Sequence, residues 1–167
     1  MEDLWPMPIA AHGLLPSEFA GIDTVTRPVI DLAPLRKALD ALEGALHYWQ
    51  IEPDDSERKP HLRAGVIQSF EFSYELAVRS LRRVLMERAI AAPPVADLSF
   101  NDLLRAAADA GLLPDAMTWR RWRDWRNRTG HSYDEAQAQA IAEAAQAFLA
   151  EARPLQERLQ RAVASDA

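Results

Sequence analysis

Cysteine is absent from this chain, which excludes disulfide bonds, thiolate nucleophiles and cysteine-based zinc sites. Glycine is scarce, and runs of valine, isoleucine or threonine are few, so there is little material for β-strands. No apolar stretch reaches the ~20 residues that span a bilayer, and the start Met1-Glu2-Asp3 is acidic where a signal peptide is basic. We therefore expect a cytoplasmic protein without a membrane segment.

Basic residues are in the minority, with 19 Lys and Arg against 25 Asp and Glu, which gives a formal net charge of -6. The field of the whole molecule should therefore repel polyanions, so any contact with nucleic acid has to be local. The 167 residues are enough for one sizeable core and too few for two ordinary domains. Abundant Ala, Leu, Arg and Glu favour helix because they lose little side-chain entropy there. These features predict one all-α domain.

The first 30 residues are rich in proline, which blocks long helices. We expect residues 1–30 to form an extension that lies on the body and residues 31–167 to form an antiparallel bundle of about five helices with a four-helix-bundle core. Apolar residues at helical spacing predict a helix at 32–50 with Asp31 as its N-cap, and a longer one from the charged, solvated connection 52–60 to about residue 91.

The second half of the bundle is predicted from its capping residues. A third helix is expected from Ser99 to a C-terminal cap at Gly111, and a fourth from near 114–115 to about Arg128. Thr129-Gly130 then breaks the helix. The fifth helix is expected to start at once, with a capping box of Ser132 and Glu135, and to carry a candidate kink at Pro154.

A cluster of arginines near the end of the fourth expected helix contrasts with the acidic composition. The cluster comprises Arg120, Arg121, Arg123, Arg126 and Arg128, and it alternates with Trp119, Trp122 and Trp125. A tryptophan stripe at this spacing usually faces a core. The planar guanidinium groups suit phosphate oxygens, although a solvated basic face explains them equally well.

His131 comes just before the expected first turn of the last helix. Unpaired backbone N–H groups there create a positive potential that attracts phosphate and favours a neutral imidazole. Arg126, one turn before the break, can fold back across Gly130 towards that imidazole. A proton-transfer group beside a cation is what phosphodiester cleavage needs. The spacing alone also fits a surface or capping histidine, so both interpretations stay open.

The segment Arg126-Asn127-x-x-x-His131 matches the R-x4-6-H motif of HEPN proteins, and Tyr133 completes the R-x4-H-x-Y form of HEPN toxins that are paired with minimal nucleotidyltransferases. Residues 65–77 and the Ala-Gly-Leu-Leu turn at 110–113 resemble the same group, which is described as nucleotidyltransferase substrate-binding proteins. The resemblance covers roughly residues 32–160.

This resemblance implies a metal-independent endoribonuclease in which Arg126 and His131 of two subunits form one cleft at a homodimer interface. His131 would transfer protons, Arg126 would stabilise charge on the phosphorus oxygens, and Asn127 would orient them. Arg120, Arg123 and Arg128 are candidates for binding RNA phosphates. The resemblance also implies no cofactor, and a cognate minimal nucleotidyltransferase antitoxin that adds AMP to Tyr133.

Two alternatives remain at this point. The chain is either a non-catalytic subunit that binds a nucleotidyltransferase or presents its substrate, or a bundle that serves only for dimerisation. A metal site is not expected, although Glu71 and Glu75 are spaced like a carboxylate pair. No histidine stands at ligand spacing on that helix, and Arg79 follows Glu75 by four residues, which favours a solvated or salt-bridged face.

Overall fold

The computed structural model describes residues 30–89 and 95–165, with the side chain of His131 left out of the description. Within these ranges the chain is helical and contains no β-strand. The elements are α1 (Ala33–Ile51), α2 (Lys59–Arg88), α4 (Phe100–Asp109), α5 (Ala116–Arg128), the 3-10 turn η1 (Thr129–His131) and α6 (Glu135–Ser165). The all-α prediction is confirmed, while the expected extension at 1–30 lies almost wholly outside the described residues.

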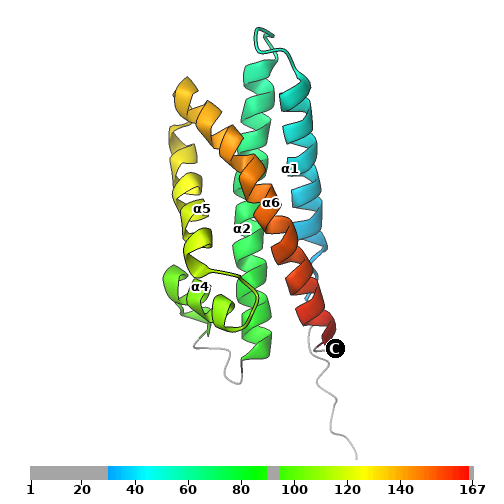
Figure 1. Ribbon diagram of the computed structural model, residues 1–167, viewed down its shortest axis with the longest axis vertical. Coiled ribbons are helices and arrows are strands. Elements are labelled where there is room, and N and C mark those ends of the chain that lie inside the picture. The colour runs from blue at the N-terminus through cyan, green and yellow to red at the C-terminus, as the bar shows by residue number, and fades with distance from the viewer. Residues whose placement is uncertain (1–29, 90–94, 166–167) are drawn as a thin grey trace, which may run out of the picture.

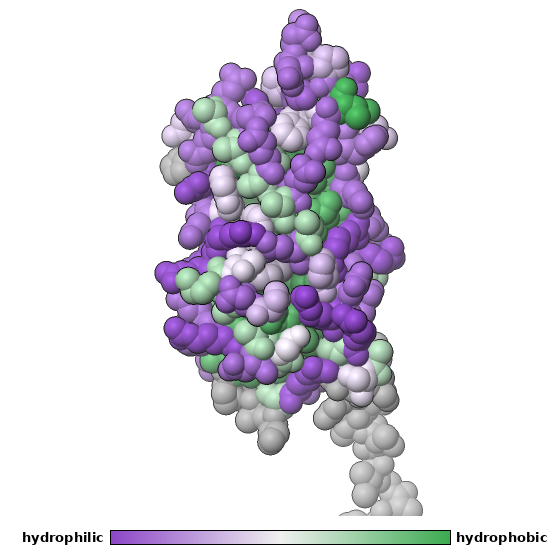
Figure 2. Space-filling view, in the orientation of Figure 1, coloured by the Kyte–Doolittle hydropathy of each residue, from purple (hydrophilic) through white to green (hydrophobic). Residues whose placement is uncertain are grey.

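Helices α1 and α2 form an antiparallel hairpin. Helix α6 crosses in front of α2 and ends near the start of α1 (Figure 1). Helix α5 lies on the other side of α2, with the short α4 near its start (Figure 1). The face formed over α5, α6 and α1 is mostly hydrophilic (Figure 2), as the outer sides of amphipathic helices should be. No helix in the described ranges is both long and apolar enough to cross a membrane.

The core is centred on Phe148 of α6, which is fully buried. Its ring centroid lies 5.0 Å from Phe70, 5.5 Å from Trp122 and 6.0 Å from Trp119. The rings of these three contacts meet edge to face, the arrangement that aromatic quadrupoles favour. Because Phe70 belongs to α2 and both tryptophans to α5, this cluster joins three helices and sets the position of α5 on the bundle.

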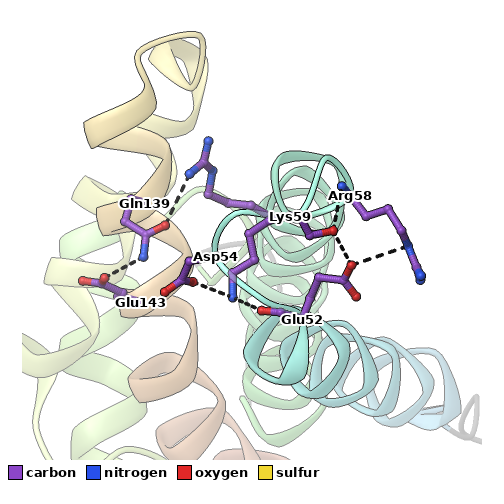
Figure 3. Close-up of polar contacts among 8 residues, drawn as sticks. Glu52, Asp54, Arg58, Lys59, Gln139 and Glu143 are labelled. Carbon is purple, nitrogen blue, oxygen red and sulfur yellow. Dashed lines mark hydrogen bonds and ion pairs between the residues drawn. The ribbon is translucent and has the colours of Figure 1, made fainter.

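The α1–α2 connection is largely exposed, as expected from its charges, and Lys59 holds it in place. Lys59 donates to the carbonyl of Glu52 at 2.7 Å and lies 3.0 Å from the carboxylate of Asp54 (Figure 3). Helix α2 also starts earlier than its apolar pattern, at Lys59. The reason is Pro60, which falls in the first turn, where its missing N–H costs no hydrogen bond.

The predicted caps of α4 are present, whereas Asp31, expected as the N-cap of α1, stands one residue before the N-cap, and Asp115 was expected only near the start of α5. Asp31 accepts a hydrogen bond from the N–H of Ala33 at 2.8 Å, although Leu32 is the residue that directly precedes α1. Ser99 caps α4 by accepting from the N–H of Asp102 at 3.3 Å. Gly111 ends this region with a positive φ of 70°. Asp115 caps α5 by accepting from two backbone N–H groups.

The start of α6 differs from the prediction. Instead of a break at Thr129-Gly130, the chain continues from α5 into η1, and the N–H of Ser132 bonds to the carbonyl of Thr129 at 3.1 Å. Helix α6 begins only at Glu135, and Asp134 caps it by accepting from the N–H of Gln137 at 2.8 Å. The capping box at Ser132 was therefore wrong, because the 3-10 turn uses the residues that were expected to reverse the chain.

Candidate functional site

The tryptophan stripe of α5 anchors the arginine cluster to the core. Trp119 and Trp122 are buried as predicted, and the indole N–H of Trp122 donates to Glu151 of α6 at 2.7 Å. Trp125 is only partly buried, and the guanidinium carbon of Arg128 lies 4.7 Å from its ring centroid. The last turn of α5 thus reaches the edge of the core, where its side chains become accessible.

The arginines do not form one uniform basic face. Arg121 pairs with Glu151 and also stacks on the ring of Trp122. Arg123 lies 4.9 Å from the ring centroid of Phe100, and Arg120 is exposed. A guanidinium held by its flat face keeps its in-plane N–H donors at the rim, so the stacked arginines remain suited to bind phosphate.

Arg126 contacts α2 through an ion pair. Its Nη2 donates to Oε1 of Glu75 at 2.7 Å, and the Arg126 side chain stays 40% exposed. The hydrogen bond that Arg126 donates to Glu75 raises the pKa of Arg126, so its positive charge is permanent. Arg126 also lines an open pocket of about 430 Å³, formed otherwise by residues of α2 that include Glu71 and Phe72. The cation therefore stands in a depression that is large enough for a phosphate group.

Thr129 fastens η1 to the same helix. It is 5% exposed, and its hydroxyl contacts the carboxylate of Glu71 as well as the carbonyl of Arg126, the latter at 2.7 Å. On the other side, the amide of Gln137 in α6 donates to the carbonyl of Arg128 at 3.0 Å. The turn that carries the backbone of His131 is thus held from both α2 and α6.

The other predicted site residues lie around this turn. Asn127 and Tyr133 are exposed, Tyr133 with 86% of its surface accessible. The backbone of His131 closes η1, whereas its side chain lies outside the described residues, so its proximity to Arg126 stays a prediction. Tyr74 also lies near the arginines, and burial raises the pKa of its phenol to about 12, against the opposing effect of Arg123.

Sequence reasoning missed the part that Glu71, Glu75 and Thr129 play. A salt-bridged face was expected for the two carboxylates, and the observed partner of Glu75 is Arg126, 51 positions along the chain. Within the described ranges no group of three His, Asp or Glu side chains is placed to hold a metal ion. The signal in the sequence was the four-residue spacing of Glu71 and Glu75. This spacing places both carboxylates on one face of the helix, where they can pair with residues of one neighbouring segment.

The fold and the site together define a helical bundle with an arginine motif at the junction of two helices. Residues 30–161 match the family described as nucleotidyltransferase substrate binding protein like. The chain is 40% identical over 100 residues, which cover 60% of this chain and 68% of the relative, to a Haemophilus influenzae protein named probable ribonuclease HepT.

A solved structure of a similar protein supports the same family. It comes from Haemophilus influenzae and is described as the fold of a substrate binding domain of a nucleotidyltransferase. It superposes with a TM-score of 0.71 and 34% identity, covering 78% of this chain and 99% of that chain. The chain therefore belongs to the nucleotidyltransferase substrate-binding protein family, and the resemblance to the HEPN group drawn from the sequence is confirmed.

Proposed function

We propose that the protein is a HEPN-type toxin, an endoribonuclease that cleaves RNA without a metal ion through Arg126 and His131. The observation that carries this proposal is the placement of Arg126, a permanently charged and partly exposed guanidinium in a pocket at the α5–η1 junction. The name of the Haemophilus influenzae relative, probable ribonuclease HepT, supports the same activity.

In the proposed reaction the ribose 2'-hydroxyl attacks the adjacent phosphate. A bond forms between the 2'-oxygen and phosphorus while the bond from phosphorus to the 5'-oxygen breaks. His131 takes part in moving the proton from the 2'-hydroxyl and to the 5'-oxygen that leaves, and the products are a cyclic phosphate and a 5'-hydroxyl. Arg126 stabilises the charge on the phosphorus oxygens, and Asn127 orients the two side chains.

The neighbouring arginines bind the RNA backbone in this proposal. Arg123 and Arg128 are held against aromatic rings, which restrains them while their N–H edges stay available. Arg120 is exposed on the same helix. Because the whole molecule carries a formal charge of -6, these local cations are needed to offset its repulsion of RNA.

A homodimer is part of the same proposal, with two copies facing each other across the pocket of Arg126. Phe72 stands beside Arg126 in this pocket, and 59% of its surface is exposed. Phe72 also lines a second pocket, of about 370 Å³, with Ala38 and Ala41 of α1. An apolar side chain between two depressions suits burial by another copy, which would bring two Arg126 side chains together.

We further propose that a minimal nucleotidyltransferase partner neutralises the toxin by adding AMP to Tyr133. This phenol is exposed and two residues from His131. A bulky anionic group here would block access to the pocket and compete with RNA phosphates for the arginines. The alternative is a non-catalytic subunit of the nucleotidyltransferase, which the description of the solved relative as a substrate binding domain favours.

The test is cleavage of single-stranded RNA by the purified full chain in the presence of EDTA. Cleavage should persist, and Arg126→Ala or His131→Ala should each slow it by about 100-fold or more, because each removes a group that acts on the transition state. Arg36→Ala, at an exposed arginine of α1, is the control and should cut like the parent.

A double Arg126→Ala, His131→Ala variant that cuts as fast as the parent would refute the proposal. A parent that does not cut RNA, but is required for nucleotide transfer by the partner enzyme, would instead support the non-catalytic subunit.

A further inference from the structure

Two carboxylates of α2 meet the arginine motif at matching spacing. Glu71 and Glu75 are one helical turn apart, and they accept from the hydroxyl of Thr129 and from Nη2 of Arg126 respectively. These partners are three residues apart, at the end of α5 and the start of η1. The carboxylate pair therefore ties the whole motif segment to α2 at two points, across separations of 58 and 51 residues.

The contact of Glu75 with Arg126 restrains the guanidinium but leaves most of its N–H donors available. The hydrogen bond joins one carboxylate oxygen to Nη2. A guanidinium has five N–H donors, so a single bond leaves the others available for phosphate oxygens. A long, 40% exposed side chain would otherwise sample many rotamers. Glu75 thus limits the orientations of Arg126 while its charge can still reach a ligand.

The contact of Glu71 with Thr129 acts on the backbone of the turn. Thr129 is buried, whereas the flanking Arg128 and Gly130 are exposed. The hydroxyl of Thr129 also has the carbonyl of Arg126 within reach, but that contact is local, and the contact with Glu71 is the one that crosses to α2 and favours one position of η1 against that helix. Because His131 is the last residue of η1, Glu71 sets where its backbone lies.

Both carboxylates have the same sign of charge as RNA. Next to a phosphate site they weaken binding, so attraction for the substrate does not explain their place there. Geometry does explain it, because a misplacement of a reacting group by ~1 Å costs about 100-fold in rate. Removal of one carboxylate should therefore raise the affinity for RNA and lower the rate of turnover.

We infer that Glu71 and Glu75 are positioning residues for RNA cleavage: Glu75 orients the guanidinium of Arg126, and Glu71, through Thr129, sets the turn that carries His131. The inference rests on the proposed function, since it assigns these residues to that reaction. Neither contacts the RNA phosphates favourably in this scheme, so their effect passes through Arg126 and His131.

The experiment compares steady-state RNA cleavage by the full chain and its variants. Glu75→Gln should lower kcat by about 10-fold or more and also lower KM by about twofold, because positioning weakens while repulsion of RNA falls. Thr129→Val, which removes the hydroxyl, should lower kcat in the same way as Glu71→Met, which removes the acceptor that a glutamine would keep. Thr129→Ser, which keeps the hydroxyl, should recover at least about fivefold of the kcat lost in Thr129→Val.

A matched control is available in the ion pair of Glu43 with Arg153, which joins α1 to α6 at 2.6 Å. Glu43→Gln makes the same chemical change away from the motif and should leave both constants as in the parent. Circular dichroism and thermal unfolding verify that each variant is folded. Equal kcat in the parent, Glu75→Gln and Glu71→Met, all folded, would overturn the inference.

A second measurement separates this inference from the proposed function. Phenylglyoxal modifies arginines, and peptide masses report the rate at Arg126 without any RNA. Glu75→Gln should speed modification of Arg126 severalfold, while Glu43→Gln should leave the rate at Arg126 unchanged, and Arg153 keeps its second ion pair, with Asp40 at 2.8 Å. If the parent does not cleave RNA, the proposed function fails, and an unchanged rate at Arg126 in Glu75→Gln would then overturn the positioning role as well.

Discussion

At the scale of single residues, the surroundings of Tyr74 show how the core and the candidate site meet. Its ring packs 6.4 Å from that of Phe148, while its phenol lies within the field of Arg123 and Arg126. Desolvation disfavours the phenolate more strongly than these cations favour it, so the pKa rises to about 12. Tyr74 thus stays protonated and uncharged beside the arginine motif.

This raised pKa predicts a loss of stability at high pH. Above pH 10 the unfolded chain releases the Tyr74 proton, whereas the folded chain keeps it up to about pH 12. The free energy of unfolding should fall across this window, by roughly 1–3 kcal/mol, and be unaffected by Tyr74 below it. Urea unfolding across the window measures the fall. It should be smaller in Tyr74→Phe and unchanged in Tyr48→Phe, an exposed site; equal falls in both variants would contradict the assignment.

At the scale of helices and turns, the glycines provide a paired test of backbone conformation. Gly111 follows α4 with φ of 70°, a region that costs other residues about 1–2 kcal/mol. Gly44 lies inside α1. An added Cβ meets nothing within 4 Å at either position, so packing does not distinguish them.

Gly111→Ala should therefore destabilise the protein by about 1–2 kcal/mol, and Gly44→Ala should stabilise it by about 0.5–1 kcal/mol, because alanine is the better helix former. Urea unfolding of both variants gives the two free energies. Shifts of the same sign would mean that the turn after α4 does not need the left-handed conformation.

Elements defined by local patterns were predicted well. Helix α1 and the caps Ser99 and Gly111 depend on residues within a few positions of each other, and such signals are readable in a sequence. The junction of α5 and α6 was not, because η1 is held by Glu71 and Gln137 from other helices. At this junction, tertiary contacts override the capping box that the local sequence predicts.

The contacts around the candidate site residues were not predicted from the sequence. Arg126 was singled out from its motif, and it does line a pocket. Its pairing with Glu75 was missed because the nearby Arg79 offered a local partner at helical spacing, whereas the observed one is 51 positions away. The observed pairing depends on tertiary packing, in which Phe148 of α6 contacts both Trp119 of α5 and Phe70 of α2 and so holds α5 beside α2.

At the scale of the whole molecule, the net charge opposes association, whereas local basic and apolar surface favours it. A formal charge of -6 repels both RNA and a second copy of the chain, so association needs local features that outweigh it. In the proposed function, the arginines of α5 supply these features for RNA. For a second copy the candidate is the surface around Phe72, where two pockets of about 430 and 370 Å³ adjoin.

Phe72→Glu should therefore convert the proposed homodimer to a monomer, since it places a charge in the proposed interface. Because Phe72 is 59% exposed in the single chain, the fold should be retained, with thermal unfolding little changed apart from the loss of dimer stability. RNA cleavage should fall together with dimer content.

Ile51→Glu, at a 62% exposed residue on the last turn of α1, is the control and should remain dimeric and active. Sedimentation velocity measures the mass of each variant. A Phe72→Glu protein that sediments like the parent would place the interface elsewhere, and a monomer with full activity would show that one copy of Arg126 and His131 suffices for cleavage.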